Sequence, residues 1–331
     1  MKKQNTTIDN MNIAYVDSHD PENPKDSVIV LVHGYLASAY VFRDVYSALI
    51  QHHRVIALDL PGFGDSDKVS PSTASYDRPF FAQTVWHLLD ELGVTAPIIL
   101  LGHSMGGAVV TQMALEQKER IAQLIMLDAM GIEIPPPFLG KVVMNPVLGK
   151  AIFMKVYNRF MLKQYLLGDV FFRKEACTDA LVDDMWRPLS TKEGKISAYA
   201  TLQKTVHPET IREHEPHLAN LNVETHLIWG EEDRIHPPVR CGEAMKKTMQ
   251  AKSFTVLAGV GHSPPEEAPD AFLQALSKVT NCNYCNYYNY NLNLETISQS
   301  ADITDIIGCT ARTICEGTNT DMGRLDYVNF P

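Results

Sequence analysis

Short, continuous runs of apolar and β-branched residues alternate with helical patterns along the first 130 residues of this chain, and this alternation restricts its fold more than any other feature. Such a run predicts a strand buried on both faces, as strands of a parallel sheet are. The predicted strands lie at residues 13–16, 27–33, 55–60, 97–101 and 124–128, and the helical patterns at 78–92 and 104–117. This order predicts βαβ units, and hence an α/β fold with a mostly parallel sheet.

A block of helical patterns interrupts this alternation. Residues 133–216 contain three consecutive prolines near their start and no clear buried strand. The α/β pattern then resumes, with two strand-like runs and a closing helical pattern at residues 225–230, 253–257 and 268–279. We therefore predict one α/β core made of residues 1–132 and 217–280, with residues 133–216 inserted as a helical cap.

Residues 281–331 differ in composition from the rest of the chain. Their first part, 281–293 (NCNYCNYYNYNLN), holds six Asn, four Tyr and two Cys, a low-complexity composition that is not expected to pack a core. We predict a C-terminal extension outside the fold. Its four thiols could bind zinc, but the spacing of the second pair and the lack of glycines around the first disfavour a metal site. These thiols belong to Cys282, Cys285, Cys309 and Cys315.

The strongest motif is Gly102-His103-Ser104-Met105-Gly106-Gly107, which matches G-x-S-x-G between a predicted strand and a predicted helix. A sharp turn from strand to helix holds the serine in a strained backbone conformation and lifts its hydroxyl clear of the sheet. The flanking glycines let neighbouring backbone approach closely. The N–H of Met105, at the start of the helix, can donate to an anion. Ser104 is therefore the candidate nucleophile.

A serine hydroxyl needs a base to take its proton, and His262 is the candidate. It lies in a glycine-rich loop, GVGHSPP, that follows the last predicted strand. Such a loop can hang over the C-terminal edge of the sheet, where Ser104 is also expected. Most of the twelve histidines are expected at the surface, among them His52 and His53.

The base in turn needs an acid that orients its ring and stabilises the imidazolium. Asp233 follows the predicted strand at 225–230, and the chain order serine, aspartate, histidine is one that such triads use. Glu231 and Glu232 lie closer to the strand end, and we favour Asp233 because it lies further out in the loop. Asp128, at the end of an earlier predicted strand, is the second candidate for the acid.

The segment His33-Gly34-Tyr35 follows the predicted strand at 27–33 and is the candidate for the second half of an oxyanion hole. An oxyanion that forms during acyl transfer is stabilised by two preorganised N–H donors. Gly34 gives the backbone freedom to turn the next N–H inward, so we assign the donors to the N–H groups of Tyr35 and Met105. The residues expected to support this loop and the turn at the serine are His33, Gly34, Gly102, His103 and Gly106.

Together these motifs resemble those of the α/β-hydrolase fold superfamily. The stretches HGY, GHSMGG, DLPGFGDSD, WGEEDRIHP and GVGHSPPEEAP carry the resemblance, which spans residues 10–280. It implies an eight-stranded, mostly parallel sheet flanked by helices, a Ser-His-Asp triad, and a cap inserted after the sixth strand. Serine in the nucleophile slot argues against the dehalogenase and epoxide hydrolase branches, which carry aspartate there. His103 before the serine resembles esterases and lipases.

The predicted function is that of a serine hydrolase of the carboxylesterase or lipase type, acting on esters of small or medium apolar acyl groups. No cofactor is expected, because neither a phosphate loop nor a nicotinamide fingerprint appears. A carbon–carbon bond or amide hydrolase on the same fold is the main alternative. The carbon–carbon hydrolases more often show Trp after the catalytic His, where this chain has Ser263. A non-catalytic, hydrolase-like binding protein is the third possibility.

Composition narrows the expected partners and location. The 29 Lys and Arg against 39 Asp and Glu give a net charge of −10, which argues against a nucleic-acid surface. A hydrophobic content of 45% excludes a wholly disordered chain. No apolar run is long enough for a transmembrane segment, and the N-terminus lacks the apolar core of a secretory signal. Because cysteines are scarce before residue 281, we expect a cytoplasmic enzyme with a small-molecule ester as its partner.

Overall fold

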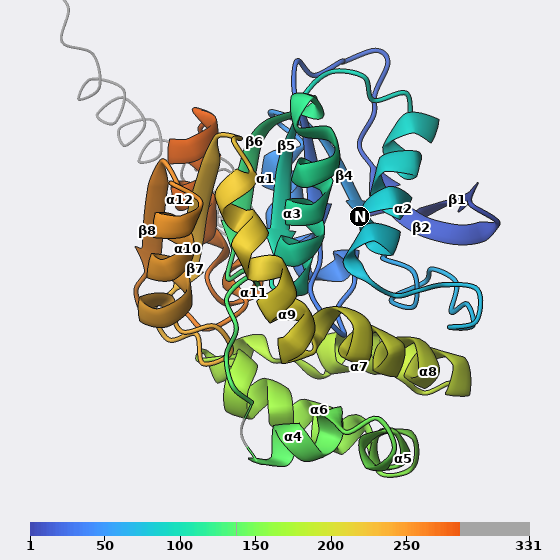
Figure 1. Cartoon of the computed structure of the whole chain (residues 1–331). Coiled ribbons are helices and arrows are strands. Elements are labelled where there is room, and N and C mark those ends of the chain that lie inside the picture. Colours follow the sequence, from blue (N-terminus) through green and yellow to red (C-terminus); the bar gives the residue numbers. More distant parts are fainter. Residues whose placement is uncertain (137, 285–331) are drawn as a thin grey trace, which may run out of the picture. The chain divides into compact units, whose positions relative to one another are not determined.

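An eight-stranded sheet forms the centre of the protein in a computed structural model that describes residues 1–136 and 138–284 (Figure 1). The strand order is β1-β2-β4-β3-β5-β6-β7-β8. All neighbours from β4 to β8 are parallel, whereas β2 runs antiparallel to both β1 and β4. The strands are β1 (Gln4–Ile8), β2 (Met11–Asp17), β3 (Val28–Val32), β4 (Arg54–Leu58), β5 (Ile98–His103), β6 (Ile121–Leu127), β7 (Thr225–Gly230) and β8 (Ser253–Leu257). The predicted mostly parallel, eight-stranded α/β fold is thus confirmed.

The central strands are mostly apolar and buried because helices cover both faces of the sheet. All six residues of β5 and of β7 are buried. The core helices are α1 (Arg43–Leu49), α2 (Arg78–Glu91), α3 (Met105–Gln117), α10 (Glu243–Thr248), α11 (Pro264–Glu267) and α12 (Pro269–Thr280). Helix α2 packs against α3, and α1 packs against α11 and α12. Since the parallel strands point the same way, the residues that follow β3, β5, β7 and β8 all emerge at one edge of the sheet.

Six α-helices of the described residues lie between β6 and β7, gathered beyond the ends of the strands in Figure 1. They are α4 (Phe138–Met144), α5 (Leu148–Lys155), α6 (Arg159–Tyr165), α7 (Asp179–Leu189), α8 (Lys192–Thr201) and α9 (Pro208–His214). Four of them begin at a side chain that accepts a backbone N–H, namely Asn158, Thr178, Thr191 and His207. The Asn and Thr caps typically stabilise a helix by about 1 kcal/mol each. No strand occurs in the described part of residues 133–216, which is consistent with the predicted helical cap.

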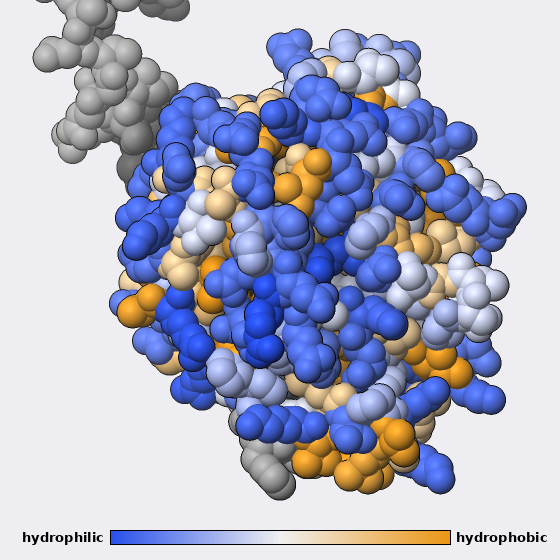
Figure 2. All heavy atoms as spheres, viewed as in Figure 1, coloured by the Kyte–Doolittle hydropathy of each residue, from blue (hydrophilic) through white to orange (hydrophobic). Residues whose placement is uncertain are grey.

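Apolar side chains of this helical segment lie both in the interior and at the surface of the protein. Phe153, Leu162 and Leu166 are buried, whereas Val147 and Phe160 are exposed over 81% and 69% of their surfaces. Figure 2 shows hydrophobic surface at its lower edge, where α4 and α5 lie in Figure 1. No helix in the described part of the chain combines the length and apolar character that crossing a bilayer requires.

The core unit extends to Tyr284 and so includes the first four residues of the predicted extension. Asn281 adopts a left-handed conformation after α12, and the side chain of Tyr284 is then almost wholly buried. Its hydroxyl is hydrogen-bonded to His53 Nε2 at 2.6 Å and to Thr280 at 2.7 Å. The expectation that His53 lies at the surface is therefore wrong, because this ring is covered by Tyr284 and hydrogen-bonded to Ser27. Residues 285–331, with three of the four cysteines considered for zinc, lie outside the described residues.

We expect Tyr284→Ala to lower the free energy of unfolding by about 3–5 kcal/mol, because it leaves a cavity beside His53. Tyr284→Phe keeps the ring and removes two hydrogen bonds, so its cost should be about 1–2 kcal/mol. Urea denaturation of the full chain measures both changes. Wild-type stability in the alanine variant would show that Tyr284 is not part of the packed core.

Candidate active site

The serine of the G-x-S-x-G motif lies on a strained turn between β5 and α3. Ser104 has φ 53° and ψ −121°, a backbone conformation that costs about 1–3 kcal/mol for a non-glycine residue. The turn packs closely against the end of β3 and against the loop that follows β3, and a glycine lies at each of these two contacts. A Cβ on Gly106 would lie 2.2 Å from the carbonyl oxygen of Val32, and one on Gly34 would lie 2.8 Å from the Ser104 Cβ. These two glycines therefore bring the loop after β3 against the serine.

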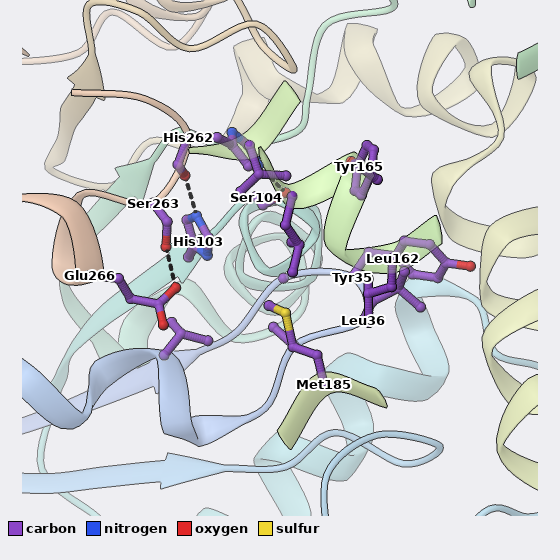
Figure 3. A pocket seen from close by; sticks show the side chains of 15 residues that line it. Tyr35, Leu36, His103, Ser104, Leu162, Tyr165, Met185, His262, Ser263 and Glu266 are labelled. Carbon is purple, nitrogen blue, oxygen red and sulfur yellow. Dashed lines mark hydrogen bonds between the residues drawn. The ribbon is translucent and has the colours of Figure 1, made fainter. Parts of the chain in front are cut away.

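His262 lies between Ser104 and Asp233. Its Nε2 is 2.9 Å from the Ser104 hydroxyl oxygen, and its Nδ1 is 2.9 Å from Asp233 Oδ2. Because Nδ1–H donates to the carboxylate, Nε2 is left to accept the serine proton. Figure 3 shows His262 and Ser104 meeting at the wall of the pocket. The structure thus brings together three side chains from the ends of β5, β7 and β8.

Hydrogen bonds fix the carboxylate of Asp233. Its Oδ1 accepts the backbone N–H groups of Ile235 and His236 at 2.8 and 2.9 Å. Burial alone would raise the pKa of Asp233, but the charge and hydrogen bond of His262, together with His236, hold the pKa below its ordinary value. The side chain is therefore an anion that can balance an imidazolium at His262.

Two further histidines flank the His262 ring. His103 and His236 each lie with ring centroids 5.2 Å from that of His262. Burial lowers the pKa of His103 to about 3 and that of His236 to about 4, so both rings are neutral at physiological pH. His103 Nε2–H donates to the carbonyl of His262 at 2.7 Å. His103 thereby supports the backbone of His262, the candidate base, and adds no competing charge.

Asp233, His236 and His262 are residues of the type that bind metal ions, and their ligand atoms lie within 4.8 Å of one another. All three are buried, and their hydrogen bonds within the site already account for this arrangement.

The loop after β3 is held by His33. This buried ring contacts the carbonyl of Gly34 through Nδ1 at 2.7 Å and accepts the N–H of Leu60 through Nε2 at 2.9 Å. Leu36 has φ 61°, so the chain turns sharply two residues after Gly34. Gly34 and Tyr35 line the same pocket as Ser104, and Met105 begins α3 directly after the serine. The two N–H groups assigned to an oxyanion hole thus belong to the residue after Ser104 and to the loop that packs against it.

A small pocket opens beside Ser104, with a volume of about 50 Å³ (Figure 3). One side is lined by apolar residues of the β3 loop, such as Leu36 and Val41, and the other by residues of the cap. The cap residues are Leu162, Tyr165, Leu166, Val170 and Met185. Residues of the segment between β6 and β7 therefore line the space beside the serine, as expected of the predicted cap.

The buried acid Glu266 also lines this pocket, and sequence analysis assigned it no role. Its Oε1 accepts a hydrogen bond from the Arg43 guanidinium at 2.5 Å, and its Oε2 accepts the Ser263 hydroxyl at 2.8 Å. Burial raises the pKa of Glu266 to about 7, although Arg43 opposes the rise. The pocket thus ends in a carboxyl group held by a cation from α1.

Glu267 is a second buried acid that sequence analysis missed. Its Oε2 accepts the N–H groups of Phe172, Arg173 and Gly261 at 2.9–3.0 Å, and its Oε1 accepts that of Ser263 at 3.2 Å. Two of these donors lie in the cap, and two lie in the loop of the candidate base. One carboxylate therefore joins the two segments.

Further hydrogen bonds connect the same segments. The N–H of His262 donates to the carbonyl of Val170 at 2.9 Å, and Arg173 Nε–H donates to the carbonyl of Gly259 at 2.9 Å. The backbone at His262 is therefore held from the cap side. The nearest signal in the sequence is the Pro264-Pro265-Glu266-Glu267 run, which directly follows the histidine loop.

The other acidic candidates lie elsewhere around this site. Asp128 is buried at the end of β6, where its Oδ1 accepts the N–H of Gly230 at 2.8 Å. Glu231 is exposed and accepts the N–H of Gly259 at 3.1 Å. It is Asp233 whose carboxylate accepts from His262.

Comparisons with known proteins indicate the family and the fold of the chain. The sequence model of the alpha/beta hydrolase family matches residues 29–275. An uncharacterised hydrolase of Bacillus subtilis, YugF, is 30% identical over 270 residues, covering 80% of this chain and 92% of that protein. The 2-hydroxy-6-oxononadienedioate/2-hydroxy-6-oxononatrienedioate hydrolase of Escherichia coli K12 is 26% identical over 75% of this chain and 85% of its own length. A solved esterase from Thermogutta terrifontis shares the fold, with TM-score 0.68 at 24% identity, over 85% of this chain and 98% of that one.

We expect Glu267→Gln to slow the labelling of Ser104 by a fluorophosphonate probe by about 10- to 100-fold, because an amide cannot accept all four N–H groups and the His262 loop shifts. Glu231→Gln is the matched control, since Glu231 is exposed and accepts one N–H of the same loop. Its rate should stay near that of the wild type. Equal rates for the two variants would show that Glu267 does not position the loop.

Proposed function

The chain belongs to the alpha/beta hydrolase family, and we propose that it is a serine hydrolase that cleaves carboxylic esters through an acyl-enzyme. The observation that carries this proposal is the pair of 2.9 Å contacts that His262 makes to Ser104 and to Asp233. A serine next to an imidazole, itself oriented by a buried carboxylate, is the arrangement that activates a hydroxyl for acyl transfer.

In the first half-reaction, the Ser104 oxygen attacks the ester carbonyl carbon while its proton passes to His262 Nε2. The carbonyl oxygen becomes an oxyanion, which the N–H groups of Tyr35 and Met105 stabilise. When the intermediate collapses, the bond to the alcohol oxygen breaks and His262 returns the proton to the leaving alcohol. The products of this half are a free alcohol and the acyl group on Ser104.

In the second half-reaction, water takes the place of the alcohol. His262 accepts a proton from the water as its oxygen attacks the acyl carbon, and the same two N–H groups hold the oxyanion. Collapse releases the carboxylic acid, and the proton returns from His262 to Ser104. Asp233 stays ionised throughout and stabilises the imidazolium in each half.

The pocket supports a short, apolar acyl group. Its volume of about 50 Å³ lies far below the roughly 300–1,000 Å³ of pockets that enclose drug-sized ligands. Leu36, Leu162 and Met185 line it with apolar surface. We therefore propose esters of small acyl groups, such as acetyl or propionyl, as the substrate class.

Hydrolysis of a carbon–carbon bond is the second candidate, and the observation that favours it is the Escherichia coli relative named for that type of substrate. The name describes a dicarboxylate, which carries two negative charges. Among the described residues that line the pocket, none bears a cationic side chain, and Glu266 is itself acidic. Charge therefore favours the ester over a dianionic substrate.

We expect Ser104→Ala to reduce kcat/KM for p-nitrophenyl acetate by about 10⁴-fold or more, and Asp233→Asn by about 10³- to 10⁴-fold, because each removes one part of a unit that acts together. Ser277→Ala, on the exposed side of α12, is the control and should match the wild type. Wild-type ester turnover in the Ser104 variant would rule out the proposed nucleophile.

We also expect the rate to fall as the acyl chain lengthens from acetate to octanoate, because the cap limits the pocket. Met185→Ala removes a side chain that lines it and should raise kcat/KM for hexanoate relative to acetate by about tenfold, which corresponds to about 1.4 kcal/mol. A series of p-nitrophenyl esters measures this ratio. An unchanged ratio would show that Met185 does not limit acyl length.

A further inference from the structure

Two buried carboxyl groups lie at the ends of neighbouring parallel strands, at the same edge of the sheet. Asp128 directly follows β6, and Asp233 lies three residues beyond β7. Their residues are 0% and 3% exposed. Asp128 has φ 43°, a left-handed conformation that aspartate tolerates better than most residues. The proposed reaction uses Asp233 and gives Asp128 no task.

The hydrogen bonds of Asp128 are incomplete if it is a carboxylate. Its Oδ1 accepts the N–H of Gly230 at 2.8 Å. Its Oδ2 is buried and has no donor among the described residues. A buried, charged oxygen without a donor is costly, whereas a protonated oxygen needs an acceptor instead.

The hydrogen bonds of Asp233 leave room for one more donor. A carboxylate offers about four acceptor positions. In Asp233, three are taken by donors from Ile235, His236 and His262. The Asp233 side chain lies within hydrogen-bonding reach of the Asp128 carboxyl group. A proton on Asp128 Oδ2 would therefore supply the fourth donor and would satisfy the orphaned oxygen at the same time.

The charges around Asp128 also favour its protonated form. The charged groups that act on it are Asp233 and Glu267. Its main-chain carbonyl accepts a hydrogen bond from His236 Nδ1, and the His236 ring packs in turn against that of His262. Burial is the largest cause that raises the pKa of Asp128 well above its ordinary value, and the charge of Asp233 adds to it. The pKa of Asp233 is lowered, so the proton of the pair belongs on Asp128.

We propose that Asp128 keeps its proton at neutral pH and donates a hydrogen bond from Oδ2 to the carboxylate of Asp233, as a positioning residue for the proposed catalytic acid. The shared proton holds Asp233 in the orientation in which it meets His262 and reduces the charge on the carboxylate. The protonation state of Asp128 does not depend on the proposed function, whereas its positioning role rests on that proposed function.

The asparagine and leucine variants at position 128 differ in whether the side chain can donate a hydrogen bond to Asp233. In Asp128→Asn, the amide oxygen can still accept from Gly230 and the amide N–H can donate to Asp233. We therefore expect kcat within about threefold of the wild-type value and a pH profile like that of the wild type. Asp128→Leu has similar volume but no donor. We expect its kcat to fall by about tenfold with little change in KM, and the acid limb of its pH profile to move to higher pH, because the less screened carboxylate holds a proton on His262 more strongly. Equal losses in both variants would overturn the positioning role.

The protonation state has its own test. The infrared difference spectrum of wild type minus Asp128→Asn, recorded on the full chain at pH 7, should contain the C=O stretch of a protonated carboxylic acid. Carboxylate bands in its place would overturn the proposal, whatever the activity of either variant. If the acid band is present but p-nitrophenyl esters are not cleaved, the proposed function fails and the proton assignment stands.

Discussion

The contact between Ser104 and His262 joins residues that are 158 positions apart, and the rest of the site depends on it. A hydrogen bond between flexible side chains gives little net stabilisation, so the backbone on both sides must fix its geometry. The serine is fixed by the strained turn between β5 and α3. The histidine lies in a loop, which needs restraints of its own. These come from Glu267, from the carbonyl of Val170 and from the ring of His103.

Four acidic side chains are buried in or beside this site, and each is stabilised in a different way. His262 and two backbone N–H groups stabilise Asp233 as an anion. Four backbone N–H groups surround Glu267, and the Arg43 guanidinium balances Glu266. Asp128 has one N–H and an orphaned oxygen, and a proton is the solution that we propose for it. Of the pair Asp128 and Asp233, only Asp233 then carries a negative charge, and this charge faces His262.

The sheet could be predicted from the sequence because its central strands are apolar throughout, as in the VIVLV of β3. The placement of Ser104, Asp233 and His262 at one edge followed from the direction of parallel strands. Strand β1 was missed because its residues are mostly exposed and polar, although the Asp9-Asn10 turn, with both φ values positive, was a hairpin signal. Glu266 and Glu267 look like solvated residues of a loop, and their partners lie far away in the sequence. Arg43 is 223 residues from Glu266, and no local pattern indicates such a pair.

The same part of the cap shapes the pocket and holds the proposed base. Leu162, Tyr165 and Leu166 line the space beside Ser104, and a few residues later Val170 to Arg173 hold the His262 loop through hydrogen bonds. A displacement of this segment by a bulky acyl group would therefore also move the backbone of His262. Under the proposed mechanism, an acyl group that is too large would bind more weakly and would also misalign the base. Selection for acyl size would then appear in kcat as well as in KM, because one segment sets both.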